Sequence, residues 1–300
     1  MHIPVLSKEV IEILNPKPKE FIIDGTIGSG GHSIEILKKI GPEGKLLGVD
    51  WDKGAIERLN RDLKLQIYPN AANVILVNDN YANLSEILKE KKLEKADGLL
   101  LDLGFSSDQL EASGRGFSFL RDEPLDMRYC PSQIITDINA ATILNSYSEK
   151  ELAEIFFQYG EERFSKRIAK KIIEEREKEP LKTTFDLVKI IKKAVPKNYE
   201  KGRIHPATRI FQALRIYVNN ELGNLSKILS KLEDILKPKG RAVIISYHSL
   251  EDRIVKQQSK LLEKEGKAKI LTKKPIRASE EEIRQNPRSR SAKLRAIIMS

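Results

Sequence analysis

The residues whose types and spacing suit ligand binding gather around a glycine-rich loop near the start of the chain. This loop, Asp24-Gly25-Thr26-Ile27-Gly28-Ser29-Gly30-Gly31-His32, follows a short apolar run and precedes a segment with helical spacing. Glycines let the backbone turn sharply and approach a ligand closely, and a helix N-terminus supplies free N–H donors. Asp50 ends the next apolar run, where a carboxylate can accept both hydroxyls of a ribose. The pattern predicts an adenosine-containing ligand.

Two ligand classes fit this pattern, a nicotinamide dinucleotide and S-adenosylmethionine. The dinucleotide fingerprint needs a third glycine where this chain has Ser33, and a pyrophosphate disfavours the nearby carboxylate of Asp24. The ammonium and sulfonium groups of S-adenosylmethionine are cations, which Asp24 and Asp102 would attract. The loop also has the form Asp-x-Gly-x-Gly-x-Gly of methyltransferases, except that Thr26 replaces the first glycine. The loop therefore favours S-adenosylmethionine, with a dinucleotide as the alternative.

Further candidates follow the third and fourth apolar runs. Tyr81 comes after the third run, where it would stack on adenine or be an ordinary half-buried loop aromatic. Asp102 and Phe105 after the fourth run have the spacing of a motif used on exocyclic amines, although Leu103-Gly104 replaces its two prolines. In such a motif the acid accepts the N–H bonds of the amine and the aromatic ring stacks on the extruded base. Asp102 and Phe105 are therefore the catalytic candidates.

The elements that must position these residues alternate between strand and helix patterns in the first half of the chain. Strands are expected at 21–23, 45–49, 74–77 and 98–103, with helices at 33–40, 53–63 and 84–93. This alternation predicts a mainly parallel α/β sheet with helices on both faces, which brings the carboxyl ends of the strands to one edge. Asp52 is expected to cap the helix that begins at Lys53.

After position 103 no strand pattern recurs until Ala242–Ser246, a gap too long for one crossover connection. Helical patterns fill it at 134–144, 150–157, 164–179 and 185–194, and one long helix is expected over 207–236. We predict an inserted α-helical domain at 108–210 within a sheet domain formed by 1–107 and 211–300. A helix at 250–265 and strands at 269–272 and 293–299 complete the chain, and the two strands predict an antiparallel hairpin at the sheet edge.

Composition limits the classes of protein to which the chain can belong. It has 300 residues, with 40% hydrophobic and 32% charged, and no apolar run long enough for a membrane helix. The N-terminus lacks the pattern of a signal peptide, and a single cysteine fits a reducing compartment such as the cytoplasm. No metal site is expected from four scattered histidines and one cysteine. The net charge of +10 is concentrated at 163–209 and 267–295, which suits a nucleic-acid partner or merely solvated helix faces.

The motifs together resemble the ribosomal RNA small subunit methyltransferase H family, collinearly over nearly the whole chain. They are His2–Leu6, the loop Asp24–Ser33, Leu101–Leu110, Arg115–Phe119, Pro124–Arg128, Thr208–Arg215, Ser246–Arg253 and Asn286–Arg295. The resemblance implies a class I S-adenosylmethionine-dependent methyltransferase fold (Rossmann-like) with a helical insertion. It also implies N4-methylation of a cytidine near the decoding site of 16S ribosomal RNA in the small (30S) subunit.

The resemblance and the loop together give a set of candidate site residues. The cofactor set is Asp24, Gly28, Gly30, Gly31, His32, Asp50, Tyr81, Asp102 and Gln109. The RNA-binding candidates are Arg115, Arg209, Arg215, Arg253, Arg288 and Arg290, within motifs or the basic loop 273–290. For several of these arginines the alternative role is a structural ion pair. For the segment Arg115 to Phe119 the alternative is packing at the hinge of the insertion. His248 is either a proton acceptor or a hydrogen-bonded loop histidine. A non-catalytic ribosome-assembly protein and a nicotinamide-dependent oxidoreductase remain the competing functions.

Overall fold

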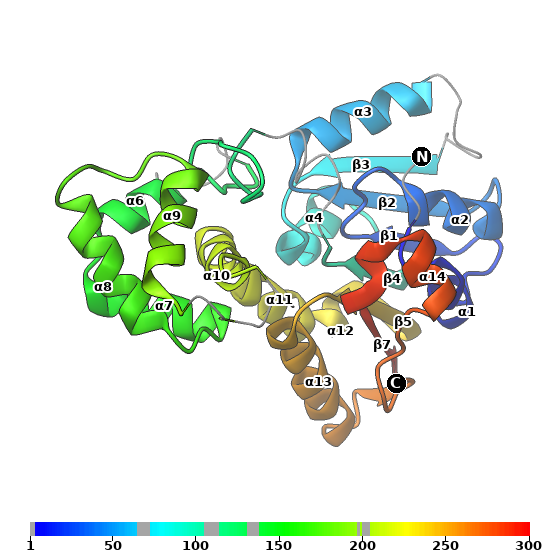
Figure 1. Ribbon diagram of the computed structural model, residues 1–300. Coiled ribbons are helices and arrows are strands. Elements are labelled where there is room, and N and C mark those ends of the chain that lie inside the picture. Colours follow the sequence, from blue (N-terminus) through cyan, green and yellow to red (C-terminus); the bar gives the residue numbers. More distant parts are fainter. Residues whose placement is uncertain (1–3, 65–72, 105–113, 131–137, 197–198, 200–204) are drawn as a thin grey trace. The chain divides into compact units, whose positions relative to one another are not determined.

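The computed structural model describes residues 4–64, 73–104, 114–130, 138–196, 199 and 205–300. The chain divides into two compact units, which are described separately. Unit 1 is formed by Met1–Gly104 and Leu222–Ser300, and unit 2 by Phe105–Glu221. Figure 1 labels the helices and strands of both.

Unit 1 is built on a seven-stranded sheet with the order β3-β2-β1-β4-β5-β7-β6. The strands are β1 (Phe21–Asp24), β2 (Lys45–Asp50), β3 (Val74–Asn78), β4 (Ala96–Asp102), β5 (Leu236–Ser246), β6 (Ala268–Ile270) and β7 (Lys293–Met299). Strands β1 to β5 pair in parallel, whereas β7 runs antiparallel to both β5 and β6. The predicted mainly parallel sheet with an antiparallel hairpin at its edge is confirmed, and this topology is the class I methyltransferase fold.

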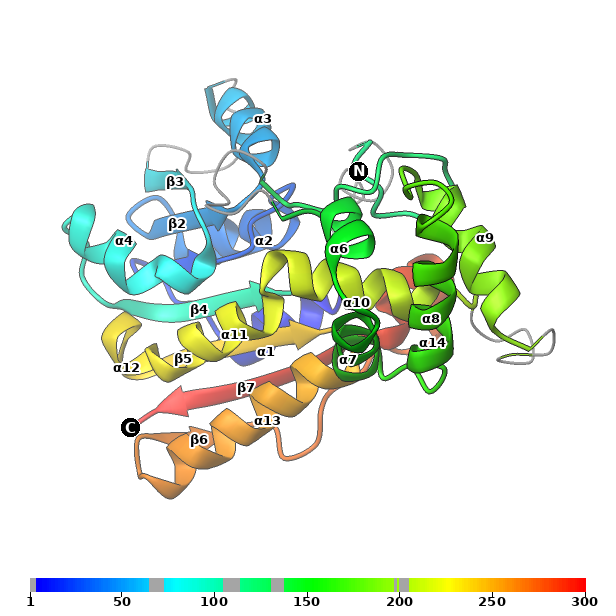
Figure 2. The same ribbon diagram turned by 90° about the vertical axis from the view of Figure 1, so that its left-hand side faces the viewer.

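Both faces of the sheet are buried, because successive strand residues enter opposite hydrophobic cores. On β1, Ile23 packs with one core and Ile22 with the other. The first core is covered by α4 (Leu84–Glu90), α11 (Glu221–Ser230), α12 (Leu232–Ile235) and α13 (Ser249–Lys264), and the second by α1 (Ser7–Leu14), α2 (Gly31–Ile40) and α3 (Lys53–Lys64). Figure 2 shows α11, α12 and α13 in front of the sheet with α1 and α2 behind it. Near-continuous apolar strands are the expected sequence pattern for such a doubly covered parallel sheet.

Three helical features of the chain differ from the sequence prediction. The helix α1 and the short helix α14 (Glu280–Gln285) were not predicted, and α14 lies within the basic loop before β7. The long helix expected at 207–236 is instead α10 (Thr208–Asn219), α11 and α12. Asn220 ends α10 in the left-handed conformation with φ of 48°, which asparagine tolerates better than most residues.

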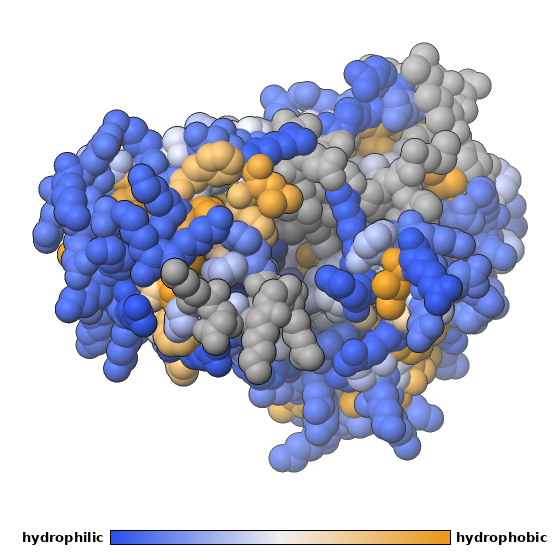
Figure 3. Space-filling view, viewed as in Figure 1, coloured by the Kyte–Doolittle hydropathy of each residue, from blue (hydrophilic) through white to orange (hydrophobic). Residues whose placement is uncertain are grey.

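Unit 2 is a helical unit of α6 (Ala140–Ser146), α7 (Glu149–Gly160), α8 (Ser165–Arg176), α9 (Thr184–Ala194) and α10. Its boundary lies at 221/222 and not at the predicted 210/211, because Phe211 and Leu214 of α10 are buried in the core of this unit. Capping boxes at Ser148 and Thr183 begin α7 and α9. The face of α8 that is visible in Figure 3 is hydrophilic. None of the helices in the described ranges is long and apolar enough to cross a membrane.

Candidate active site

Three aspartates end neighbouring parallel strands of unit 1 and therefore share one edge of the sheet. Asp24 ends β1, Asp50 ends β2 and Asp102 ends β4. Strand β1 lies between β2 and β4, so the three carboxylates surround the start of the glycine loop. This edge is where ligands bind in open α/β sheets.

Asp24 organises the glycine loop from beneath. Its carboxylate, only 2% exposed, accepts hydrogen bonds from Ser33 Oγ at 2.7 Å and from the backbone N–H of Thr26 at 3.2 Å. Burial raises the pKa of Asp24, although the Ser33 hydroxyl acts in the opposite direction. Ser33, which departs from the dinucleotide fingerprint, thus holds the first acidic residue of the loop.

The glycine loop adopts backbone conformations that require glycine. Gly28 and Gly30 have φ of 52° and 79°. These values lie in the left-handed region, where a residue with a side chain would be strained. Gly31 begins α2, and a Cβ there would lie 3.3 Å from Pro4. The loop therefore presents bare backbone ahead of the N-terminus of α2, as the sequence predicted for a cofactor-binding loop.

Asp50 connects the glycine loop to the end of β2. Its Oδ2 accepts from Gly28 N–H and its Oδ1 from Asp52 N–H, both at 2.8 Å. Burial raises the pKa of Asp50 to about 6, against the effect of these two donors. A carboxylate oxygen has two lone pairs, so each oxygen keeps capacity for a ribose hydroxyl. Asp52 itself accepts from Gly54 N–H and caps α3, as predicted.

Asp102 is fixed at the end of β4 by contacts on its backbone and on one carboxylate oxygen. Its N–H donates to Thr26 Oγ1 at 2.6 Å, so the residue that replaces the first glycine of the loop joins β1 to β4. Oδ1 accepts from the Tyr247 hydroxyl at 2.8 Å and from Gly104 N–H at 3.2 Å. Oδ2 lies 3.4 Å from Nε2 of His32, and the Asp102 side chain is 18% exposed. Asp102 thus has Oδ1 held by two donors, while Oδ2 lies beside the His32 ring.

His32 is a buried histidine in the first turn of α2. Among the described residues, Nδ1 has no partner, and Nε2 has the 3.4 Å contact with Asp102 Oδ2 without the geometry of a hydrogen bond. Burial lowers its pKa, but the carboxylates of Asp102 and Asp24 outweigh burial and the pKa is raised overall. Buried polar atoms almost always find a partner, so this ring fits a site that a bound ligand completes.

The remaining cofactor candidates lie after β3 and after β4. Tyr81 begins a 3₁₀ turn after β3, capped by Asn80, whose side chain accepts from Ala82 N–H. The Tyr81 Cβ would lie 3.4 Å from a Cβ built on Gly25, which places it at the start of the glycine loop. Phe105 and Gln109 lie outside the described residues, so the aromatic half of the Asp102 motif and the Gln109 assignment stay predictions.

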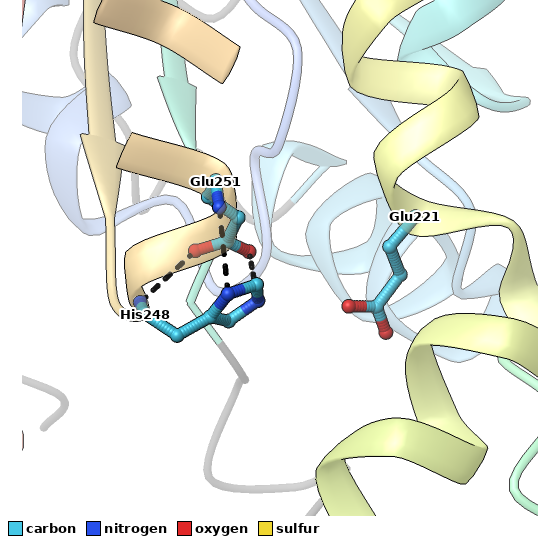
Figure 4. A group of neighbouring side chains, drawn as sticks. All are labelled: Glu221, His248 and Glu251. Carbon is cyan, nitrogen blue, oxygen red and sulfur yellow. Dashed lines mark hydrogen bonds and ion pairs between the residues drawn. The ribbon is translucent and has the colours of Figure 1, made fainter. Parts of the chain in front are cut away.

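Sequence reasoning missed Tyr247, which follows β5 and contacts Asp102. Strand β5 neighbours β4, so the rule that located the three aspartates also directs attention to the residue after β5. His248 caps α13: its Nδ1 accepts from Glu251 N–H at 3.4 Å, while Glu251 Oε2 accepts from Tyr247 N–H at 2.8 Å. Figure 4 shows the His248–Glu251 contacts within unit 1 and also draws Glu221, the last residue of unit 2. His248 is therefore a hydrogen-bonded capping residue.

The three arginine candidates of unit 2 are engaged within that unit. Arg115 donates to the carbonyls of Arg128 and Tyr129 at 3.0 and 2.6 Å. Arg209 donates to the Glu161 carbonyl at 3.2 Å. Arg215 forms a two-pronged pair with Glu221 at 2.7 and 2.9 Å, in which the side chains are 17% and 11% exposed. The structural alternative for Arg215 is thus realised.

The arginine candidates of unit 1 have more open surroundings. Arg253 on α13 and Arg290 in the 3₁₀ turn at Pro287–Ser291 are exposed, and Arg288 is half-buried. The turn follows α14, which is tied to the N-terminal segment because Glu282 accepts from Leu6 N–H at 2.7 Å. The basic loop therefore has a fixed anchor in unit 1, while Arg290 extends toward solvent.

Comparison with known proteins identifies relatives along the full length of the chain. A family model described as the MraW methylase family matches residues 1–299. The chain is 48% identical over 298 residues to a protein of Thermotoga neapolitana named Ribosomal RNA small subunit methyltransferase H, covering 98% of this chain and 95% of that protein. Proteins with the same name from Clostridium botulinum (strain Loch Maree / Type A3) and Syntrophotalea carbinolica are each 46% identical, covering 98% and 99% of this chain and 97% of each relative.

Proposed function

The chain belongs to the MraW methylase family, and we propose that it transfers a methyl group from S-adenosylmethionine to N4 of a cytidine in 16S ribosomal RNA. The observation that carries the proposal is the arrangement at the sheet edge. Asp102 is anchored by Oδ1, and its Oδ2 lies beside the His32 ring, next to a glycine loop that is bonded to Asp50. The relatives' shared name, which specifies small-subunit ribosomal RNA, supports the substrate class.

The residues present fit S-adenosylmethionine, which when bound supplies an electrophilic methyl group on a sulfonium sulfur. Asp50 would accept the ribose hydroxyls and the bare backbone at Gly28 and Gly30 would admit the ligand closely. Nδ1 of His32, which has no hydrogen-bond partner among the described residues, is available to polar groups of the ligand. Asp24, at the end of β1 directly before the loop, contributes negative charge, which suits a cationic ligand. Tyr81 at the start of the loop would stack on the adenine.

Asp102 acts on the nucleophile. The amino nitrogen of cytosine has its lone pair delocalised into the ring, so it is a poor nucleophile until its N–H bonds are drawn toward an acceptor. In our proposal Asp102 Oδ2 accepts an N–H of this amine and turns the lone pair toward the methyl group, a contribution of positioning. The reaction converts cytidine and S-adenosylmethionine into N4-methylcytidine, S-adenosylhomocysteine and one proton, which leaves the amine. Phe105 is expected to stack on the base.

For the RNA, we propose Arg253, Arg288 and Arg290 of unit 1 as phosphate contacts. Arg288 and Arg290 lie in the segment with the local basic excess, and Arg253 is exposed on α13. Arg115, Arg209 and Arg215 would then act by holding unit 2 in shape. The substrate is a folded target in the 30S subunit, and the reaction takes place in the cytoplasm.

The test is transfer of labelled methyl from S-adenosylmethionine to 30S subunits that lack the modification, followed by nucleoside analysis of the RNA. We expect label in N4-methylcytidine. Label in a different nucleoside would contradict the role of Asp102, and binding of the subunit with no transfer under any condition would favour the assembly-protein alternative. Subunits that already carry the modification serve as the control, because they have no free acceptor.

A further inference from the structure

Tyr247 is placed so that its hydroxyl reaches the catalytic candidate Asp102 from the next strand. Its O–H donates to Asp102 Oδ1 at 2.8 Å, across the pairing of β4 with β5. Burial, followed by the charge of Asp102, raises the pKa of the Tyr247 phenol far above its ordinary value. The phenol is therefore protonated at neutral pH and donates this hydrogen bond.

Gly104 makes room for this contact. A Cβ on Gly104 would lie 2.7 Å from both Cε2 and Cζ of the Tyr247 ring, which is closer than real Cβ atoms approach such carbons. Gly104 also donates its own N–H to the same Asp102 oxygen. The Leu103-Gly104 pair, which stands where related amine-modifying motifs have two prolines, thus admits the tyrosine and adds a donor.

The backbone of Tyr247 is held as firmly as its hydroxyl. Its N–H donates to Oε2 of Glu251, a carboxylate that is 3% exposed and belongs to the capping box of α13. Ring and backbone are therefore both tied to fixed elements, so the hydroxyl has little freedom to leave Asp102.

We infer that Tyr247 is a positioning residue that selects the Asp102 rotamer in which Oδ1 is occupied and Oδ2 faces the substrate amine. Without the phenol, Oδ1 keeps, among the described residues, the longer bond from Gly104, and Oδ2 keeps its 3.4 Å contact with His32, so the carboxylate is held less firmly and can offer either oxygen. The inference rests on the proposed function, because it assigns Tyr247 a role in that reaction.

The first test is Tyr247→Phe, which keeps the ring against Gly104 and removes only the hydroxyl. We expect the methyl-transfer rate at saturating S-adenosylmethionine and 30S subunits to fall about tenfold, as loss of one hydrogen bond to a charged group implies. The dissociation constant of S-adenosylmethionine should change by less than about twofold. Tyr147→Phe is the matched control, since it removes a phenol that pairs with Tyr217 in unit 2. An unchanged rate in Tyr247→Phe, or an equal loss in Tyr147→Phe, would overturn the inference.

A double-mutant cycle tests whether Tyr247 acts through Asp102. In an Asp102→Asn background, removal of the phenol should cost much less than tenfold in whatever transfer remains, because the oriented carboxylate is already gone. Independent, additive effects would show that Tyr247 acts elsewhere.

A crystal structure of Tyr247→Phe separates failure of this inference from failure of the proposed function. We expect the Asp102 carboxylate in more than one conformer in the variant and in one conformer in the parent protein, whatever RNA is methylated. A single, unmoved carboxylate in the variant would contradict the inference even if methyl transfer to cytidine is observed. Absence of transfer by the parent protein, with Asp102 rotating freely in the variant, would instead contradict only the proposed function.

Discussion

The aspartates of unit 1 and the arginines of unit 2 are both charged groups held by hydrogen bonds, but their partners differ. Asp24, Asp50 and Asp102 accept mainly from backbone N–H groups and hydroxyls of the loops that follow the strands. Arg115 and Arg215 donate to carbonyls and to a carboxylate within their own unit. In the proposed function the first arrangement serves a ligand, whereas the second uses charges to stabilise the fold of unit 2.

The largest expected effect is on Asp102. Asp102→Ala removes the acceptor for the amine, so methyl transfer should fall by about a thousandfold or more, within the range expected for loss of an essential polar group at a reacting centre. Circular dichroism and the unfolding midpoint should remain close to those of the parent, because the backbone bond to Thr26 is retained. Near-normal methylation of 30S subunits by this variant would show that the carboxylate does not serve the reaction.

Asp50→Ala should weaken S-adenosylmethionine binding by about 10- to 100-fold, through loss of two charge-assisted bonds to the ribose. Isothermal titration calorimetry measures this change. Glu57→Ala on the exposed surface of α3 is the control and should leave affinity unchanged. An unaltered dissociation constant in Asp50→Ala would mean that Asp50 only shapes the loop through Gly28.

Arg215→Ala should act on stability. The variant leaves Glu221 with the Tyr129 hydroxyl but without its cation, in a site where the Glu221 side chain is 11% exposed. We expect the free energy of unfolding to fall by about 2 kcal/mol, measured by urea titration. If stability is unchanged while 30S binding is lost, the contrast between the two regions fails, because Arg215 would then be serving the RNA.

The pH dependence of cofactor binding sharpens the role of Asp50. Its pKa is raised to about 6, so the ionised form that best accepts ribose hydroxyls is lost as pH falls through this value. Affinity for S-adenosylmethionine should therefore drop up to about tenfold per pH unit below about 6. The same raised pKa means that the folded state binds this proton more tightly than the unfolded chain, so the contribution of Asp50 to stability increases from pH 6 toward 4. The affinity of Asp50→Asn should lack this pH dependence.

The smallest effect is expected at Arg290. Because its side chain is exposed, Arg290→Ala should leave the free energy of unfolding within about 0.5 kcal/mol of the parent. If Arg290 contacts a phosphate, 30S affinity should fall a few-fold and the salt dependence should lose about one unit of slope. An identical salt slope in parent and variant would exclude that contact.

The sequence was sufficient to predict the sheet edge because topology alone places strand ends together. Apolar runs that end in Asp24, Asp50 and Asp102 predict three neighbouring carboxylates without knowledge of any side-chain contact. The partners of the arginines could not be predicted in this way. Whether Arg215 meets Glu221 or a phosphate depends on the first break in the expected long helix, at the left-handed residue Asn220.

Tyr247 illustrates the same limit at the active site. Its position after β5 was predictable, but its contact with Asp102 depends on the space left by Gly104 and on the rotamer of the ring. Likewise, Thr26 and Ser33 read as departures from glycine patterns, and only the structure shows that their hydroxyls hold Asp102 and Asp24. Element identity follows from periodicity, whereas hydroxyl partners follow from packing.

The adjacency of β4 and β5, which are separated in sequence by all of unit 2, has a consequence for synthesis of the chain. When β1 to β4 have emerged from the ribosome, the side of β4 that later pairs with β5 has no partner strand. The helices α11 to α13, which cover one face of the sheet, have not yet been synthesised. Such an exposed strand is prone to pair with other chains. The core of unit 2 lies entirely within residues 105–221, so it can form during this interval. A folded insert replaces a long flexible loop and lowers the entropy lost when β5 finally joins β4.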